Sequence, residues 1–259
     1  MMFLLGQQIF SNRMLSIIPP VILSFESIFK NQLIYSPLLD IFQLFFLLSC
    51  FYFFNKAILT KKIFKNLVIA NVFLGFFMAT KFFITGITIV IAWILVLFLR
   101  KKWYELKSLI LYLPVSILVM LSSYIRLFAF DYSIRSFLGV QKYVFLYHKS
   151  QLILPFTIWP LLLFNRWYVW FGDKSVISDG QWSITWPIVT ILSLVTVVLY
   201  VFKKIPKNKY VDVLIVWFLS YVAFFSFGQI SSRYFVILIP VLYIISLYGL
   251  IEVYKIYRK

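Results

Sequence analysis

Residues 66–99 read NLVIANVFLGFFMATKFFITGITIVIAWILVLFL. Between Leu67 and Leu99 the only charged residue is Lys81. One membrane-spanning helix needs about 20 apolar residues, so this run is too long for a single span. It fits two spans folded back on each other, with Thr80 and Lys81 at the turn. The pattern therefore predicts a helical hairpin in a membrane.

Lys81 has two interpretations. A cation at the end of a span is costly unless its amine reaches the interface, a water-filled cavity or an anion. In the first interpretation, the long side chain extends to the interface and has no further role. In the second, it points at a charged ligand held at the membrane surface. The local sequence leaves both interpretations open.

The whole composition indicates a membrane protein. Of the 259 residues, 63% are hydrophobic and 13% are charged, and the mean hydropathy is +0.96. Soluble proteins are about half apolar. Apolar runs recur along the chain without the alternation of an outer-membrane barrel, which predicts helices. We expect an all-α, multi-pass protein with about eight transmembrane helices in one domain, 1–259, and one long interfacial outer loop at about 126–185. The expected spans are 14–29, 37–55, two within 67–99, 106–125, 184–202, 211–227 and 234–251.

We interpret the net charge of +17 as a signal that orients the chain in the membrane. Basic residues stand in short clusters between apolar runs, which is typical of loops that fix topology, so we expect no nucleic-acid partner. Placing the loop 56–65 inside puts most of the 25 basic residues in short inside segments. The turn 30–36 and the long loop then lie outside. We expect a plasma-membrane protein with its active face outside. Its single cysteine, Cys50, excludes an intrachain disulfide.

The segment 151–171 is apolar enough to span. Pro155, Pro160 and Arg166 argue against a span, and a span there would move the later basic clusters outside. We therefore expect this segment to lie in the outer interface. The surrounding region, 131–186, is rich in aromatic residues, which we interpret as an interfacial belt. Its tryptophans are Trp159, Trp167, Trp170, Trp182 and Trp186.

The expected topology gathers unusual polar residues on the outer side. Carboxylates and cations on one membrane face favour a site for an anionic, lipid-borne substrate. Each residue also has a structural interpretation: a buried polar pair for the carboxylates, interfacial anchors for the arginines, and a packing role for the lone histidine. No spacing typical of metal ligands or of a phosphate-binding loop occurs, so we expect no metal site. The candidates are Glu26 and Asp40 as catalytic residues, and Lys81, Arg126, His148 and Arg233 as substrate-binding residues.

Four segments, taken in order, carry a resemblance to a known family. Residues 15–46 read LSIIPPVILSFESIFKNQLIYSPLLDIFQLFF, and 71–83 read NVFLGFFMATKFF. Residues 147–163 read YHKSQLILPFTIWPLLL, and 231–240 read SSRYFVILIP. In these segments the chain resembles the C-type integral-membrane glycosyltransferases, most closely the protein O-mannosyltransferase-like branch. The resemblance extends over nearly the whole chain.

This resemblance implies a glycosyltransferase. Its donor would be a polyprenyl-phosphate sugar, and its acceptor a protein, lipid or glycan at the outer face. Lys81 and Arg233 would contact the phosphate, and Asp40 would belong to the second outer-loop motif. The family's acidic first outer loop has no counterpart here, so we expect the family's N-terminal spans to be missing, with Glu26 as a conceivable substitute base. Gln32 stands where the family has an arginine.

Two other functions fit the same composition. A flippase or polymerase subunit of envelope polysaccharide assembly would also gather charges in a cavity for a lipid phosphate. A non-catalytic membrane partner is the third possibility. Transporters typically carry inverted repeats and charges near the membrane midplane. This chain shows no obvious repeat and its polar residues gather at one face, which favours the transferase.

Overall fold

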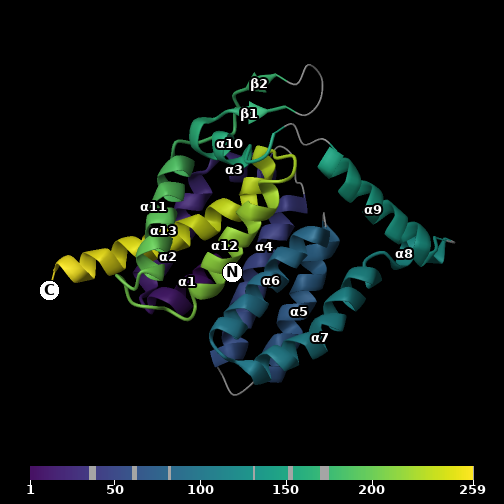
Figure 1. Ribbon diagram of the computed structural model, residues 1–259, viewed down its shortest axis with the longest axis horizontal. Helices are drawn as coiled ribbons and strands as arrows, with labels where there is room; N and C mark the ends of the chain where they lie inside the picture. Colours follow the sequence, from purple (N-terminus) through teal and green to yellow (C-terminus); the bar gives the residue numbers. More distant parts are fainter. Residues whose placement is uncertain are drawn as a thin grey trace.

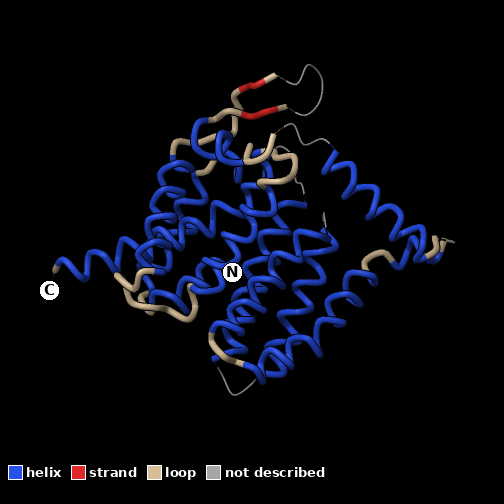
Figure 2. Tube along the Cα trace, in the orientation of Figure 1, coloured by secondary structure: helices blue, strands red, loops and turns tan. Residues whose placement is uncertain are grey.

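The structure is a computed structural model, which describes residues 1–34, 39–59, 63–80, 83–130, 132–150, 154–169 and 175–258, with the side chains of 148–150 left out. The described residues form helices and one short β-hairpin (Figures 1 and 2). The helices before the hairpin are α1 Met2–Phe10, α2 Arg13–Phe25, α3 Ser27–Ile34, α4 Leu39–Leu59, α5 Ile63–Thr80, α6 Phe83–Leu99, α7 Trp103–Ser122, α8 Ile125–Ala129, α9 Ile134–Ser150 and α10 Ile158–Phe164. Strands β1 Trp167–Tyr168 and β2 Val176–Ile177 follow, and then α11 Thr185–Val201, α12 Asp212–Phe225, the 3-10 helix η1 Ser232–Tyr234 and α13 Phe235–Tyr257.

The stretch 66–99 forms two helices, as its pattern predicted. Helix α5 ends at Thr80 and α6 begins at Phe83. A Cβ atom on Gly75 of α5 would lie 2.6 Å from the Ser116 carbonyl oxygen of α7, so these two helices approach closely. On α6, the indole of Trp93 stacks on Phe54 of α4 with the ring centroids 5.0 Å apart. The hairpin is thereby packed between α4 and α7.

Helix α13 forms the centre of the molecule. Every residue from Phe235 to Ser246 is buried, as expected for a helix that is apolar on all sides. Its neighbours include α2, α4, α11 and α12 (Figure 1). Close packing is visible at Gly249, where a Cβ atom would overlap the Thr196 side chain of α11.

Within the described ranges, four segments are long and apolar enough to cross a membrane: Leu39–Leu59, Ile63–Thr80, Trp103–Ser122 and Ser232–Tyr257. Helices α2, α6, α11 and α12 are also apolar but shorter, with 13 to 17 residues each. The all-α class is confirmed, and the four long helices are compatible with an integral membrane protein.

The prediction of a polar turn at 30–36 was wrong for residues 30–34. Residues 27–34 continue as α3, which includes Lys30. The chain breaks earlier, at Glu26, whose backbone is extended with φ −65° and ψ 127°. This break turns the Glu26 side chain into the protein, where it finds hydrogen-bond partners. A buried polar interaction, which sequence pattern does not reveal, therefore sets the end of α2.

The region expected as a long outer loop contains helices of its own. Helix α10 has seven residues, about 10 Å of helix, and is too short to cross a membrane. The indole of Trp167 donates a hydrogen bond of 2.8 Å to the Ile230 carbonyl oxygen, which fastens β1 to the segment before η1. Helix α9, which sequence analysis read as part of a loop, stands apart from the bundle with α8 (Figure 1).

The connections lie at two opposite edges of the bundle. In Figure 2 the loops 100–102 and 203–211 lie at the lower edge, whereas α3, α10 and the β-hairpin lie at the upper edge. The lower loops carry basic clusters, among them Lys101, Lys102, Lys203 and Lys204. This arrangement agrees with the sides that charge alone assigned to these loops.

Candidate functional site

The Glu26 carboxylate is the centre of one buried polar cluster. The side chain follows the end of α2, and the residue is 3% exposed. One carboxylate oxygen accepts hydrogen bonds from the Thr185 hydroxyl at 2.5 Å and from the Tyr243 hydroxyl, and the other accepts from the Trp186 indole at 3.1 Å. Within the described part of the chain, no Lys or Arg lies within ion-pair distance of Glu26. Three donors therefore compensate for the burial of this carboxylate.

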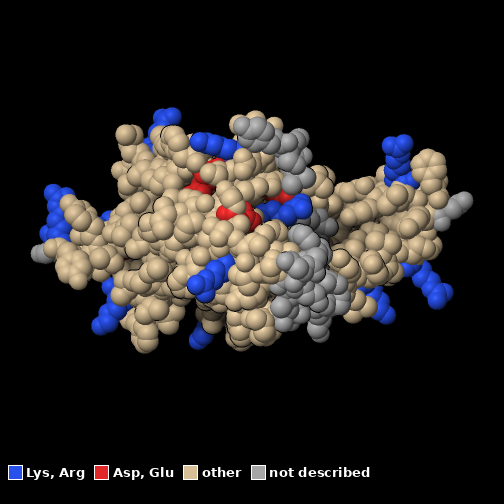
Figure 3. Space-filling model, turned by 90° about the horizontal axis from the view of Figure 1, so that it is seen from above, with Lys and Arg blue, Asp and Glu red and all other residues tan. Residues whose placement is uncertain are grey.

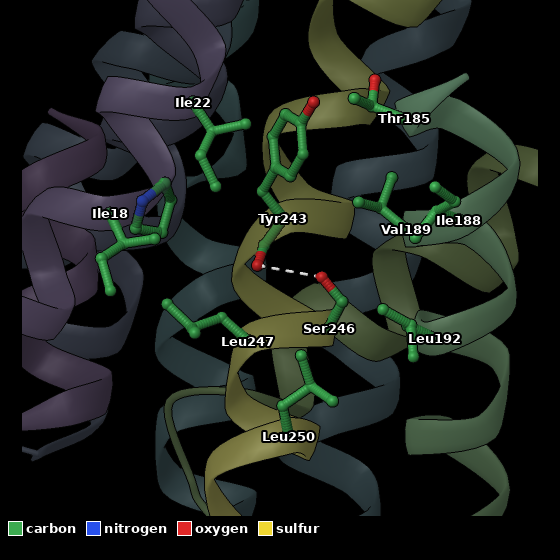
Figure 4. Close-up of a pocket in the computed structure, with 11 residues that line it drawn as sticks. Ile18, Ile22, Thr185, Ile188, Val189, Leu192, Tyr243, Ser246, Leu247 and Leu250 are labelled. Carbon is green, nitrogen blue, oxygen red and sulfur yellow. Dashed lines mark hydrogen bonds between the residues drawn. The ribbon is translucent and has the colours of Figure 1, made fainter. Parts of the chain in front are cut away.

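An apolar pocket of about 250 Å³ adjoins this cluster between α2, α11 and α13 (Figure 4). Most of its lining is aliphatic, including Ile22, Ile188 and Leu247. Thr185 and Tyr243 also line it, and the Tyr243 side chain points along α13 toward Thr185 (Figure 4). The two hydroxyls that bind Glu26 thus form a polar end to the groove. Its one other polar side chain among the described residues is Ser246, whose hydroxyl donates to the Tyr243 carbonyl oxygen (Figure 4).

Asp40 and Arg233 form a second cluster. Asp40 lies in the first turn of α4, where the helix dipole favours a negative charge, and is 1% exposed. An Arg233 nitrogen lies 3.2 Å from its carboxylate, while the arginine side chain stays 43% exposed. Arg233 Nε is buried without a hydrogen bond to any described residue. The pair presents an oriented, accessible guanidinium at the start of α13.

The two clusters lie at different positions along α13. Arg233 precedes the helix, whereas Tyr243 lies eight residues beyond Phe235, about 12 Å along the axis. The Trp186 indole donates to Glu26, and its ring packs edge-on against Phe235, the first residue of α13, with the centroids 5.2 Å apart. The structure therefore brings Asp40 and Arg233 together and gives Glu26 separate partners, two on α11 and one on α13.

Figure 3 looks down on the upper edge of the bundle. Acidic atoms are visible only near the middle of this face, with Lys and Arg atoms beside them. Within the described residues, no group of three or more His, Cys, Asp or Glu side chains is placed to hold a metal ion. The polar chemistry here is that of carboxylates, hydroxyls and a guanidinium.

No family model, curated protein or solved structure matches this chain. The resemblance to C-type glycosyltransferases therefore stays a prediction. So do the roles that it implied for Asp40 and Arg233.

Among the other predicted site residues, only Arg126 has a side chain that the structure describes. Lys81 lies outside the described residues. His148 lies in α9, where the backbone is described and its side chain is not. Arg126 lies on α8, is exposed, and has no acidic partner among the described residues.

Sequence reasoning missed Thr185, Trp186 and Tyr243. Trp186 was interpreted as a belt residue, but it is 0% exposed and its indole binds Glu26. Belt tryptophans keep one edge at the interface, so this interpretation was wrong for Trp186. Trp159, Trp167 and Trp182 are partly buried, and Trp170 lies outside the described residues. The hydroxyls of Thr185 and Tyr243 gave no signal, because they lie 159 and 217 residues from Glu26 in the sequence.

Proposed function

We propose that the protein is an eight-span membrane enzyme that transfers a sugar from a polyprenyl-phosphate carrier to an acceptor at the outer face of the plasma membrane. The observation that carries the proposal is the groove between α2, α11 and α13, which is mostly aliphatic and ends in two hydroxyls bonded to a buried carboxylate. Such a groove suits a molecule with a long apolar chain and a polar head.

The apolar lining supports a lipid as the substrate. Ile188 is 51% exposed and Leu250 is 51% exposed, so the groove opens sideways onto the surface that membrane lipid would cover. A polyprenyl chain could enter from the bilayer without crossing water. The resemblance of the sequence to lipid-phosphate-dependent transferases points to the same substrate class.

The accessible guanidinium of Arg233 favours a substrate with an anionic head group. Asp40 holds the orientation of this guanidinium. Arginine binds phosphate oxygens with charge-assisted hydrogen bonds, which strengthen as negative charge develops on a leaving phosphate. Lys81 is a further phosphate ligand in this proposal, on the resemblance alone.

Glu26 supplies the base. In the reaction, the acceptor oxygen forms a bond to the anomeric carbon, and the bond from that carbon to the phosphate oxygen breaks. The acceptor proton passes to a Thr185 or Tyr243 oxygen, whose own proton passes to Glu26. Polyprenyl phosphate leaves with its bonding electron pair, next to Arg233.

The test uses the full chain reconstituted in lipid nanodiscs, with polyprenyl-phosphate [14C]mannose and, in parallel, polyprenyl-phosphate [14C]glucose as donors. We expect release of polyprenyl phosphate and passage of label out of the lipid fraction when cell-envelope acceptors are added. Glu26→Gln should lower the rate at least about 100-fold, because it removes the proton acceptor. Arg233→Ala should lower it about as much.

The matched control is Arg135→Ala, which removes an exposed arginine of α9 and should leave the rate unchanged. Unaltered rates in Glu26→Gln and Arg233→Ala would refute the roles given to these residues. In sealed liposomes, donor that crosses the bilayer with its sugar still attached would refute the transferase. That outcome would favour a flippase or polymerase subunit of envelope assembly.

A further inference from the structure

A second pocket lies at the lower edge of the bundle, opposite the edge that holds the Asp40–Arg233 cluster. It has a volume of about 440 Å³ and lies between the end of α6, the loop 203–211 and the second half of α13. Its lining includes three basic residues, Arg100, Lys207 and Lys209, and one acidic residue, Glu252. Neither the sequence patterns nor the proposed reaction gives this pocket a role.

Hydrogen bonds hold the loop that forms its wall. The Tyr248 hydroxyl donates to the Pro206 carbonyl oxygen at 2.5 Å. The Asn208 backbone nitrogen donates to the Tyr200 hydroxyl at 2.9 Å, and its side-chain amide donates to the Ile9 carbonyl oxygen at 3.2 Å. Bonds to α1, α11 and α13 thus fix the backbone on both sides of Lys207, so the pocket wall is preformed.

The acidic groups nearby are already neutralised. Asp212 binds Arg100, with 2.5 Å between the ion-pair atoms, and also accepts from the Tyr200 hydroxyl. Glu252 lies 2.6 Å from the Lys255 amine. Lys207 and Lys209 are exposed and have no acidic partner in the described part of the chain. The pocket therefore presents two uncompensated positive charges, and its complement is an anion.

The surroundings favour a lipid over a free anion. A neighbouring pocket of about 560 Å³ shares Pro206 and Glu252 with the 440 Å³ pocket. Tyr254 and Ile256 line this neighbouring pocket and are 62% and 49% exposed. Apolar and aromatic side chains beside lysines match a phospholipid, whose phosphate needs cations and whose chains need apolar contact.

We propose that this pocket binds the phosphate head group of an anionic membrane lipid from the inner leaflet. Lys207 and Lys209 contact the phosphate, and the end of α13 contacts the adjoining part of the lipid. The lipid fastens the loop 203–211 and the end of α13 to the inner surface of the membrane.

The test is a native mass-spectrometry titration of the purified full chain in detergent with phosphatidylglycerol or phosphatidylcholine. We expect one phosphatidylglycerol to bind at concentrations where phosphatidylcholine does not. Lys207→Gln with Lys209→Gln should weaken phosphatidylglycerol binding roughly 10- to 30-fold, because each lysine near an anionic lipid contributes a several-fold factor.

The matched control is Lys203→Gln with Lys204→Gln, which removes the same charge from the same loop at residues that do not line either pocket. It should change binding less than about 3-fold, since only long-range attraction is lost. Equal weakening in the two double variants, or equal binding of both lipids, would overturn the site. Displacement of the lipid by inorganic phosphate at matching concentrations would show that the pocket takes a free anion, which would overturn the lipid assignment.

Discussion

At the scale of single residues, the contact between Asp40 and Arg233 is informative because the two side chains differ in exposure. The carboxylate is almost completely buried, while the arginine reaches the surface. An ion pair with one buried member has a stronger Coulomb interaction than a pair in water, because the local dielectric is lower. The pair therefore contributes to stability as well as orienting the guanidinium.

A double-mutant cycle measures this contribution. With Asp40→Asn, Arg233→Gln and the double variant, we expect a coupling energy of about 1–3 kcal/mol. Unfolding in mixed detergent and dodecyl sulfate micelles, followed by tryptophan fluorescence, gives the free energies. The control cycle uses Glu252 and Lys255, three residues apart on one helix, where the lysine is 60% exposed. This pair should couple by about 0.5 kcal/mol or less. Equal coupling in both cycles would contradict a role for burial.

The sequence identified Glu26 and Asp40 as unusual because carboxylates are costly in apolar segments. It also marked Arg233 as a candidate, but nothing in a single sequence pairs it with Asp40, 193 residues away. Glu26 shows the same limit more strongly. Its partners are hydroxyl and indole groups, which occur throughout the chain and carry no charge pattern. Burial could be predicted as a cost, whereas the groups that compensate for it could not.

At the scale of elements, the contact between α5 and α7 depends on the absence of a side chain. Gly75 allows the backbone of α7 to approach, since a Cβ atom there would lie 2.6 Å from both the Ser116 carbonyl oxygen and the Val119 side chain. Small residues at helix contacts are the usual means of close packing in membranes. Separation of these two helices would loosen the hairpin of α5 and α6 at its contact with the rest of the bundle.

Gly75→Ala should therefore destabilise the protein by about 1–3 kcal/mol, because a backbone atom must move. The matched control is Gly139→Ala on α9, where an added Cβ meets nothing within 4 Å. There the higher helix propensity of alanine should leave stability unchanged or raise it by up to about 1 kcal/mol. The same micelle-unfolding measurement applies. A Gly75→Ala protein as stable as the parent would contradict the close approach of α5 and α7.

Apolar periodicity and length located the helices of the bundle well, because each buries or exposes a long uninterrupted apolar run. The division of 67–99 into α5 and α6 is the clearest case. Apolar length did not locate helices in which charged and aromatic residues are interspersed. Helix α9 was not foreseen, because charged residues interrupt its apolar ones and few of its residues are buried. The start of α3 was missed because Glu26, rather than a proline or glycine, ends α2.

At the scale of the whole molecule, the basic loops and the polar clusters lie at opposite edges. This separation agrees with the prediction that 203–209 and the β-hairpin lie on opposite sides of the membrane (Figure 2). That 203–209 faces inward stays a prediction from charge. The predicted orientation also depends on residues 151–171 not crossing the membrane. Helix α10 is too short for a span, and its Ile158, Leu161 and Leu162 are fully buried in protein.

Cysteine labelling tests the orientation directly. In a Cys50→Ala background, Gly139→Cys, Gly180→Cys and Lys207→Cys each provide one exposed thiol. A membrane-impermeant maleimide should label the first two in intact cells, and the third only after permeabilisation. Labelling of Gly139→Cys and Gly180→Cys from opposite sides would mean that the segment between them crosses the membrane. Labelling of Lys207→Cys in intact cells would reverse the orientation.

The burial of α13 also constrains how the protein is made. This helix is synthesised after every helix that it contacts, so α1, α2, α4, α11 and α12 enter the membrane before the segment that fills the space among them. Until α13 arrives, the aromatic side chains that pack against it, such as Trp186 on Phe235 and Tyr200 on Tyr248, lack these partners. A nascent chain interrupted before Phe235 lacks the helix against which α1, α2, α4, α11 and α12 pack. The bundle therefore cannot close until the segment 235–257 has been synthesised.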